Sequence, residues 1–173
     1  MITNKFLLMT LFTFCIIGAS FAQTTMKLRE GMKAPNFSLQ NYQGKIFKLS
    51  SFKGKSPVVI YFYPKAGTPG CTKQACGIRD DLRKFKDKNI VVLGISTDPK
   101  IELKKFIREN KINFPLLSDH DKSITAKYGV LRDDGKAKRF TFIIDRKGRI
   151  AKIMEVTDIS KHSLDIFEIA SQL

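Results

Sequence analysis

Two cysteines five residues apart, Cys71 and Cys76, are the side chains of this chain best suited to chemistry. Cys71 falls where a loop rich in proline and glycine, residues 64–70, meets the beginning of an expected helix over residues 72–86. A helix N-terminus carries partial positive charge and unpaired N–H groups, which stabilise a thiolate relative to a thiol. Two lysines of the same stretch add positive charge. Cys71 is therefore a candidate nucleophile.

The spacing of the two cysteines argues against a permanent disulfide. In an intact helix, Cα atoms five residues apart lie about 8.6 Å from each other. A disulfide needs its Cα atoms within about 7 Å. A bond closing so small a loop would also restrain the unfolded chain little. The spacing favours a bond that forms and breaks as the helix unwinds, and Gly70 and Gly77 would ease that change.

Alternating strands and helices are expected to position these cysteines. Residues 58–63 (VVIYFY) are β-branched and aromatic, which predicts a strand buried on both faces. Apolar residues recur at steps of three and four along residues 72–86, which predicts an amphipathic helix with Ala75, Ile78, Leu82 and Phe85 buried. The other expected elements are a hairpin turn at 41–44 before a strand at 46–49, a strand at 90–96, a helix at 100–110, a strand at 114–117, a helix at 122–128, a hairpin of 140–144 and 150–156, and a helix at 162–173.

This order predicts an α/β fold with a mixed central sheet flanked by helices, in one domain. In the closing helix we expect Leu164, Phe167, Ile169 and Ala170 to pack inward. A chain of 173 residues with 43% apolar content can bury one ordinary core.

The first 22 residues resemble a secretory signal peptide. Lys5 precedes a twelve-residue apolar run at 6–17, and Ser20 and Ala22 stand where a signal peptidase reads small residues. A membrane span needs about 20 apolar residues, so an anchor is the weaker interpretation. We expect residues 1–22 to be removed, the domain to be residues 23–173, and the protein to be exported to a periplasm or secreted.

Composition excludes several classes of site. Three cysteines are too few for a disulfide-dense scaffold or a four-thiolate zinc site, and two histidines are too few for a histidine-rich metal centre. We expect no metal and no cofactor. Loss of Lys5 with the leader lowers the formal net charge from +15 to +14. Without zinc-finger spacing or an aromatic RNA-binding signature, nucleic acid is not an expected partner, and weak attraction to anionic surfaces is the expected effect of the charge.

Residues 62–76 (FYPKAGTPGCTKQAC) resemble the active-site segment of peroxiredoxins, with its Pro-x-x-x-Thr-x-x-Cys signature. The position of the second cysteine, five residues after the first, resembles the pattern of the peroxiredoxin Q branch, which is also called bacterioferritin comigratory protein. Further blocks of similarity lie at residues 31–37, 114–119, 127–130 and 139–145. The resemblance thus covers nearly the whole chain after the leader.

The resemblance implies a thioredoxin-like fold and reduction of hydrogen peroxide and organic hydroperoxides at cysteine. Cys71 would be the peroxidatic residue, oxidised to a sulfenic acid, and Cys76 the resolving residue that closes an intramolecular disulfide. Thr68 would offer a hydroxyl to thiolate and peroxide, Pro64 would shield the pocket from water, and Arg139 would stabilise the thiolate and hold the peroxide oxygens. A thioredoxin-like dithiol protein would recycle the disulfide, and resolution within one chain suits a monomer.

Other interpretations of these residues remain open at this stage. A secreted thiol–disulfide oxidoreductase of thioredoxin type is the main alternative, although its usual Cys-x-x-Cys pair is absent. A copper-delivery protein of the same fold and a non-enzymatic basic domain are weaker ones. Thr68, Pro64 and Arg139 could be ordinary loop or surface residues. We interpret His120 as a polar turn residue, His162 as structural or surface, and Gln74 as contributing a hydrogen bond without taking part in catalysis.

Overall fold

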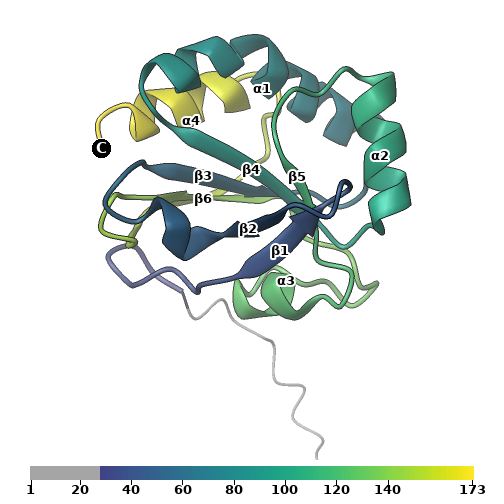
Figure 1. Ribbon diagram of the computed structural model, residues 1–173, viewed down its shortest axis with the longest axis horizontal. Coiled ribbons are helices and arrows are strands. Elements are labelled where there is room, and N and C mark those ends of the chain that lie inside the picture. The colour runs from purple at the N-terminus through teal and green to yellow at the C-terminus, as the bar shows by residue number, and fades with distance from the viewer. Residues whose placement is uncertain (1–27) are drawn as a thin grey trace, which may run out of the picture.

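The computed structural model describes residues 28–173, which form a seven-stranded mixed sheet with helices on both faces (Figure 1). The strand order is β2-β1-β5-β4-β3-β6-β7. Strand β3, in the interior of the sheet, pairs parallel with β4 and antiparallel with β6, and β4 pairs parallel with β5. The strands are β1 (Ser38–Asn41), β2 (Ile46–Lys48), β3 (Val58–Phe62), β4 (Val91–Ser96), β5 (Leu116–Ser118), β6 (Phe140–Ile144) and β7 (Ile150–Glu155). The expected α/β fold with a mixed sheet is confirmed.

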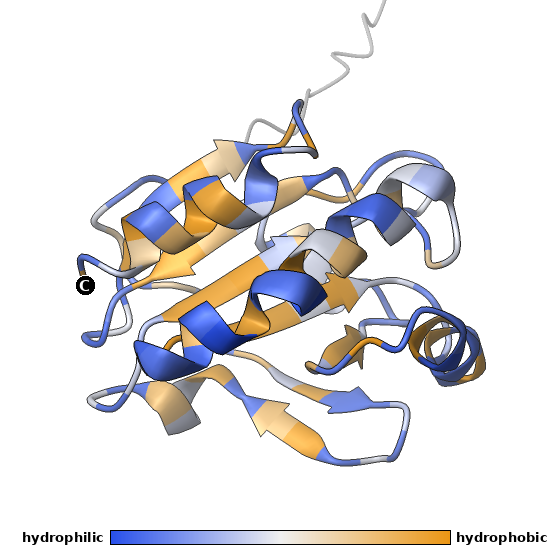
Figure 2. Cartoon of the chain, turned by 90° about the horizontal axis from the view of Figure 1, so that it is seen from above, coloured by the Kyte–Doolittle hydropathy of each residue, from blue (hydrophilic) through white to orange (hydrophobic). Residues whose placement is uncertain are grey.

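Four α-helices and one 3-10 helix cover the sheet in the described part of the chain. They are α1 (Pro69–Asp87), α2 (Lys100–Glu109), α3 (Ser123–Lys127), α4 (His162–Ala170) and the 3-10 helix η1 (Leu49–Phe52). Helices α1 and α4 pack against each other across one face (Figure 1). In Figure 2 the strands are largely orange, whereas blue residues mark the outward faces of the helices.

Strand β3 is buried along its whole length, as its apolar sequence predicts. Alternate residues of a strand point to opposite faces of the sheet. Val59 and Tyr61 belong to the core under α1, α2 and α4, whereas Ile60 and Phe62 belong to the core on the side of α3. The segment after β3 is therefore anchored from both faces, and that segment carries the cysteines.

Helix α1 begins at Pro69, three residues before the predicted start at Thr72. Proline is well tolerated at the first helical position because that residue's N–H would have no intrahelical partner. The earlier start places Cys71 inside the first turn of α1. The predicted burial of Ala75, Ile78 and the two later apolar residues of the helix is confirmed.

Further expectations differ from the structure, among them the end of the last helix, which is at Ala170 rather than at Leu173. Strand β5 begins at Leu116 rather than at Phe114, although Phe114 is buried in the core from the preceding loop. In α4 the prediction that Leu164 packs inward is wrong, because 49% of its surface is exposed. The buried face is instead set by His162, Ile166 and Ala170, which follow one another at intervals of four residues.

The expected leader at residues 1–22 lies outside the described residues. Within residues 28–173, no helix has both the length and the apolar character needed to cross a bilayer.

Candidate active site

Cys71 lies in the first turn of α1, which follows β3 after the loop of residues 63–68. Thr68 is the residue that caps this helix, and its carbonyl accepts the first helical hydrogen bond, from the N–H of Thr72 at 2.8 Å. The N–H groups ahead of it have no helical carbonyl to bind, so Cys71 lies where helix polarity favours a negative charge. Only 1% of Cys71 is exposed, which places the thiol in a largely dry environment.

Arg139 brings a permanent positive charge to this thiol. Its Nη2 lies 3.3 Å from Cys71 Sγ, within hydrogen-bonding distance of a sulfur. The register of the sheet explains the encounter, because Phe140 pairs with Phe62 and so places residue 139 beside the end of β3. A guanidinium in this position can pair with a negative charge on the sulfur or on a bound substrate oxygen.

A buried hydrogen-bond network extends from Arg139 to the last helix. Arg139 Nη1 donates to Gln74 Oε1, and Gln74 Nε2 lies 3.1 Å from His162 Nδ1. On the other side of the ring, His162 Nε2 lies 2.8 Å from Thr141 Oγ1 on β6. The network thus connects α1, β6 and α4 next to Cys71, which Arg139 also contacts.

His162 is neutral at ordinary pH in this setting. Burial of the imidazole, together with the nearby charge of Arg139, lowers the pKa of His162 from 6.5 to about 4. Of the two interpretations expected for His162, structural or surface, the structure shows the structural one, because only 1% of the residue is exposed. His120 is exposed, as expected for a turn residue, with Nδ1 3.4 Å from the carbonyl of Thr97.

Cys76 occupies a different side of α1. Both cysteines are free, and Cys76 is half-buried where Cys71 is fully buried. Cys76 lines a hollow of about 330 Å³ to which Ile159, Ser163 and Leu164 also contribute, so it faces the junction of α1 with α4. With both thiols in one intact helix, their separation by five residues keeps them on different faces.

The remaining predicted site residues surround the helix start. Thr68 is half-buried, and its hydroxyl donates to the carbonyl of Lys65 at 3.1 Å rather than to the thiol. Pro64 is half-buried in the loop that leaves β3. Gly70 has a steric role, because a Cβ there would lie 3.3 Å from Arg139 Nη2 and from Ile159 Cδ1. Glycine at this position therefore lets the guanidinium lie over the first turn of α1.

Gln74 and His162 are the two residues of this site to which the sequence analysis gave no part in catalysis. The hydrogen bonding expected of Gln74 is confirmed by its contacts with Arg139 and His162, and a residue three positions after Cys71 is expected on the same helix face. His162 could not have been found from local sequence, because only the packing of α4 against α1 brings it to Gln74.

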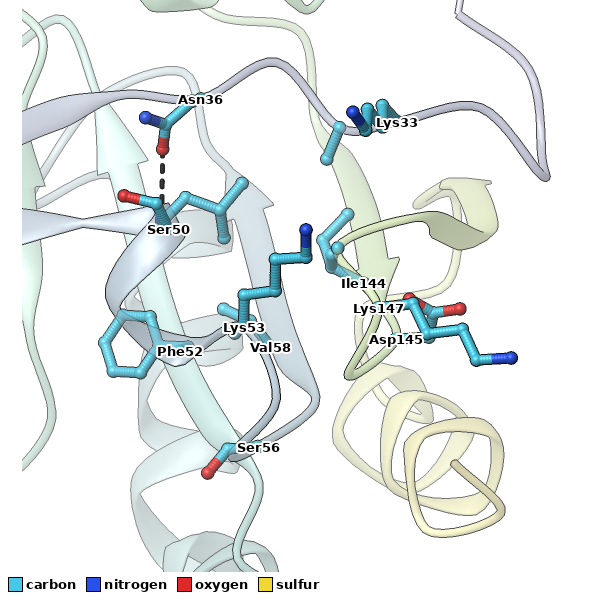
Figure 3. Close-up of a pocket in the computed structure, with 13 residues that line it drawn as sticks. Lys33, Asn36, Ser50, Phe52, Lys53, Ser56, Val58, Ile144, Asp145 and Lys147 are labelled. Carbon is cyan, nitrogen blue, oxygen red and sulfur yellow. Dashed lines mark hydrogen bonds between the residues drawn. The ribbon is translucent and has the colours of Figure 1, made fainter.

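A separate cavity of about 170 Å³ lies at the opposite end of β3, beside its first residue Val58 (Figure 3). Apolar and polar side chains line it together with the charged Lys33, Lys53, Asp145 and Lys147, and neither cysteine does. Among residues 28–173, no three acidic, cysteine or histidine side chains gather closely enough to hold a metal ion. The groups suited to redox chemistry are therefore those around Cys71.

Comparison with known proteins agrees with this assignment. Residues 31–153 match the AhpC/TSA family. The chain is 43% identical to a putative peroxiredoxin bcp of Haemophilus influenzae over 143 residues, covering 78% of this chain and 91% of the relative. It is 41% identical to peroxiredoxin Bcp of Escherichia coli, over 78% of this chain and 90% of that one. The crystal structure of peroxidoxin BcpB from Mycobacterium tuberculosis superimposes with a TM-score of 0.79 at 32% identity, covering 84% of this chain and 98% of that chain. The chain belongs to the AhpC/TSA family, among the peroxiredoxins of the Bcp and Q branch.

Proposed function

We propose that the chain is a thiol-dependent peroxidase in which Cys71 is the peroxidatic residue and Cys76 the resolving residue. The observation that carries the proposal is the position of Cys71 Sγ, in the first turn of α1 and 3.3 Å from Arg139 Nη2. The helix N-terminus and the guanidinium of Arg139 both favour the thiolate, which is the nucleophilic form of cysteine. Membership of the peroxiredoxin branch supports the same chemistry.

In the first step the Cys71 thiolate attacks the terminal oxygen of a hydroperoxide. The S–O bond forms as the O–O bond breaks, so two electrons pass from sulfur to the peroxide. The leaving oxygen takes up a proton and departs as water or an alcohol, while Cys71 becomes a sulfenic acid. Arg139 and the N–H groups of the first helical turn stabilise the negative charge that develops on the leaving oxygen.

In the second step the thiol of Cys76 attacks the sulfenic sulfur of Cys71. An S–S bond forms, the S–O bond breaks and the oxygen leaves as water. A dithiol protein of thioredoxin type then returns two electrons to the disulfide. Because Cα atoms five residues apart in a helix are about 8.6 Å from each other, the first turns of α1 must unwind before this bond can form.

The test is a single turnover followed by mass spectrometry. Protein in a Cys15→Ser background, which leaves two thiols, is reduced, freed of reductant and mixed with one equivalent of hydrogen peroxide. A thiol alkylator stops the reaction at short times. We expect rapid loss of both thiols as one intramolecular disulfide, blocked by Cys71→Ser and halted at the sulfenic acid by Cys76→Ser.

Survival of both thiols for many minutes would contradict the peroxidase function. The secreted thiol–disulfide oxidoreductase would then become the leading hypothesis, although the relatives found do not favour it. Incubation with an oxidised substrate protein in place of peroxide would test that alternative directly.

The expected export, monomeric state and attraction to anionic surfaces are proposed on the sequence alone. Removal of residues 1–22 would appear as a mature N-terminus at Gln23 in protein recovered from outside the cytoplasm. Light scattering on the reduced and oxidised forms would test the monomer. Failure of the mature protein to bind anionic vesicles at low salt would contradict a surface role for its net charge of +14, which is the +15 of the full chain less Lys5.

A further inference from the structure

We infer that His162 is a positioning residue of the peroxidase, holding the amide of Gln74 so that Gln74 orients Arg139 against the reactive thiol. The inference rests on the proposed function. His162 belongs to α4 and takes no part in either step of the proposed reaction. Each atom of the buried network either donates or accepts a hydrogen bond, and these roles determine how Gln74 is oriented.

The network admits one arrangement of its protons. A guanidinium only donates, so the atom of Gln74 that faces Arg139 must be its carbonyl oxygen. The amide nitrogen of Gln74 therefore points to His162, and because it too only donates, Nδ1 of His162 must accept. The neutral imidazole then carries its proton on Nε2, which donates to Thr141 Oγ1.

His162 is thus the residue that fixes the direction of the Gln74 amide. Within residues 28–173, the side chain of Arg139 makes hydrogen bonds to Cys71 and Gln74 alone. Gln74 and His162 are each about 1% exposed, so water cannot readily replace a lost partner. Without the acceptor on His162, the amide nitrogen of Gln74 would be buried and unpaired, which favours its rotation away from Arg139.

Three substitutions of His162 distinguish the contribution of Nδ1 from that of Nε2. An asparagine amide can present its oxygen where Nδ1 lies, so His162→Asn keeps the acceptor for Gln74. A glutamine amide reaches the position of Nε2, so His162→Gln keeps only the contact with Thr141. His162→Leu, close in shape to asparagine, keeps neither. His120→Asn at the exposed histidine is the matched control.

The measurement is the second-order rate constant for oxidation of Cys71 by hydrogen peroxide, with thiolate absorbance at 240 nm as a second readout. All proteins carry Cys15→Ser and Cys76→Ser, so one thiol reports. We expect His162→Leu and His162→Gln to react about ten- to a hundredfold more slowly than the parent protein, because the guanidinium of Arg139 would be displaced from the thiol. We expect His162→Asn and His120→Asn to stay within about threefold of the parent protein on the same scale.

A double substitution provides the second check. If His162 acts through Gln74, the Gln74→Leu/His162→Leu protein reacts no more slowly than Gln74→Leu alone. The inference would be overturned if the reductions in rate from the two single substitutions added up in the double variant. It would also be overturned if all three His162 variants reacted at the same rate, whether that rate was the parent's or a lower one. A parent protein that does not react with peroxide would contradict the proposed function instead, so the two failures are distinguishable.

Discussion

Burial of His162 predicts that acid destabilises this fold more than its surface charges alone would. The pKa of His162 is about 4 in the folded protein, against 6.5 for an exposed histidine. Between these values the unfolded chain binds a proton that the folded chain does not, so the free energy of unfolding falls as pH falls. One pKa unit corresponds to about 1.4 kcal/mol. Relative to neutral pH, His162 therefore lowers the free energy of unfolding by about 2 kcal/mol at pH 5 and by about 3 kcal/mol at pH 4.

The assay is urea unfolding of the reduced protein at several pH values between 7 and 4. Circular dichroism follows it, because the chain contains no tryptophan. The informative quantity is the difference between the parent protein and His162→Asn, which has no imidazole to titrate. Other titrating groups contribute equally to both proteins, among them Asp119, whose pKa is raised by burial.

We expect the parent protein to lose about 3 kcal/mol more than His162→Asn between pH 7 and pH 4. The exposed His120 serves as the control, and His120→Asn should follow the parent at every pH. Parallel curves for the parent and His162→Asn would refute the reasoning. They would show that the imidazole is either solvated or already protonated in the folded state.

Three further substitutions test other parts of the structure. Arg139→Lys keeps a charge but lacks the planar fork that reaches Cys71 and Gln74 together, so we expect stopped-flow oxidation by peroxide to slow about tenfold or more. Gly94→Ala places a Cβ 2.5 Å from a methyl group of Leu116 in the core, and chemical unfolding should show a loss of about 1–3 kcal/mol. Asp119→Ala removes a buried carboxylate that accepts three hydrogen bonds at the start of α3, and thermal unfolding at neutral pH should show a lower midpoint, corresponding to about 2 kcal/mol or more.

Local patterns predict the parts of this fold that depend on local physics. The apolar run of β3 predicts burial on both faces, and the three- and four-residue spacing along α1 predicts burial on one face. The structure confirms both patterns of burial. The start of α1 is missed because Pro69 and Gly70 favour a loop on composition alone. In three dimensions Pro69 occupies the one helical position where proline costs little.

Contacts between distant elements are harder to predict. Arg139 reaches Cys71 only through the pairing of β6 with β3, a register that no single stretch of sequence determines. The peroxiredoxin resemblance supplied that residue, whereas periodicity would have placed it on the surface. His162 lacks even this support, and its role emerges only where α4 meets α1.

The two steps of the proposed cycle make opposite demands on the same helical turns. Attack on peroxide needs the first turn of α1 intact, with Cys71 beside Arg139 and the helix N-terminus. Disulfide formation needs these turns unwound, because the spacing of Cys71 and Cys76 forbids the bond in a helix. Gln74 lies between the cysteines, so unwinding there must break its hydrogen bond to His162. In the proposed cycle the hydrogen bond between Gln74 and His162 therefore favours the first step and opposes the second, so weakening it is expected to slow attack on peroxide and to speed disulfide formation.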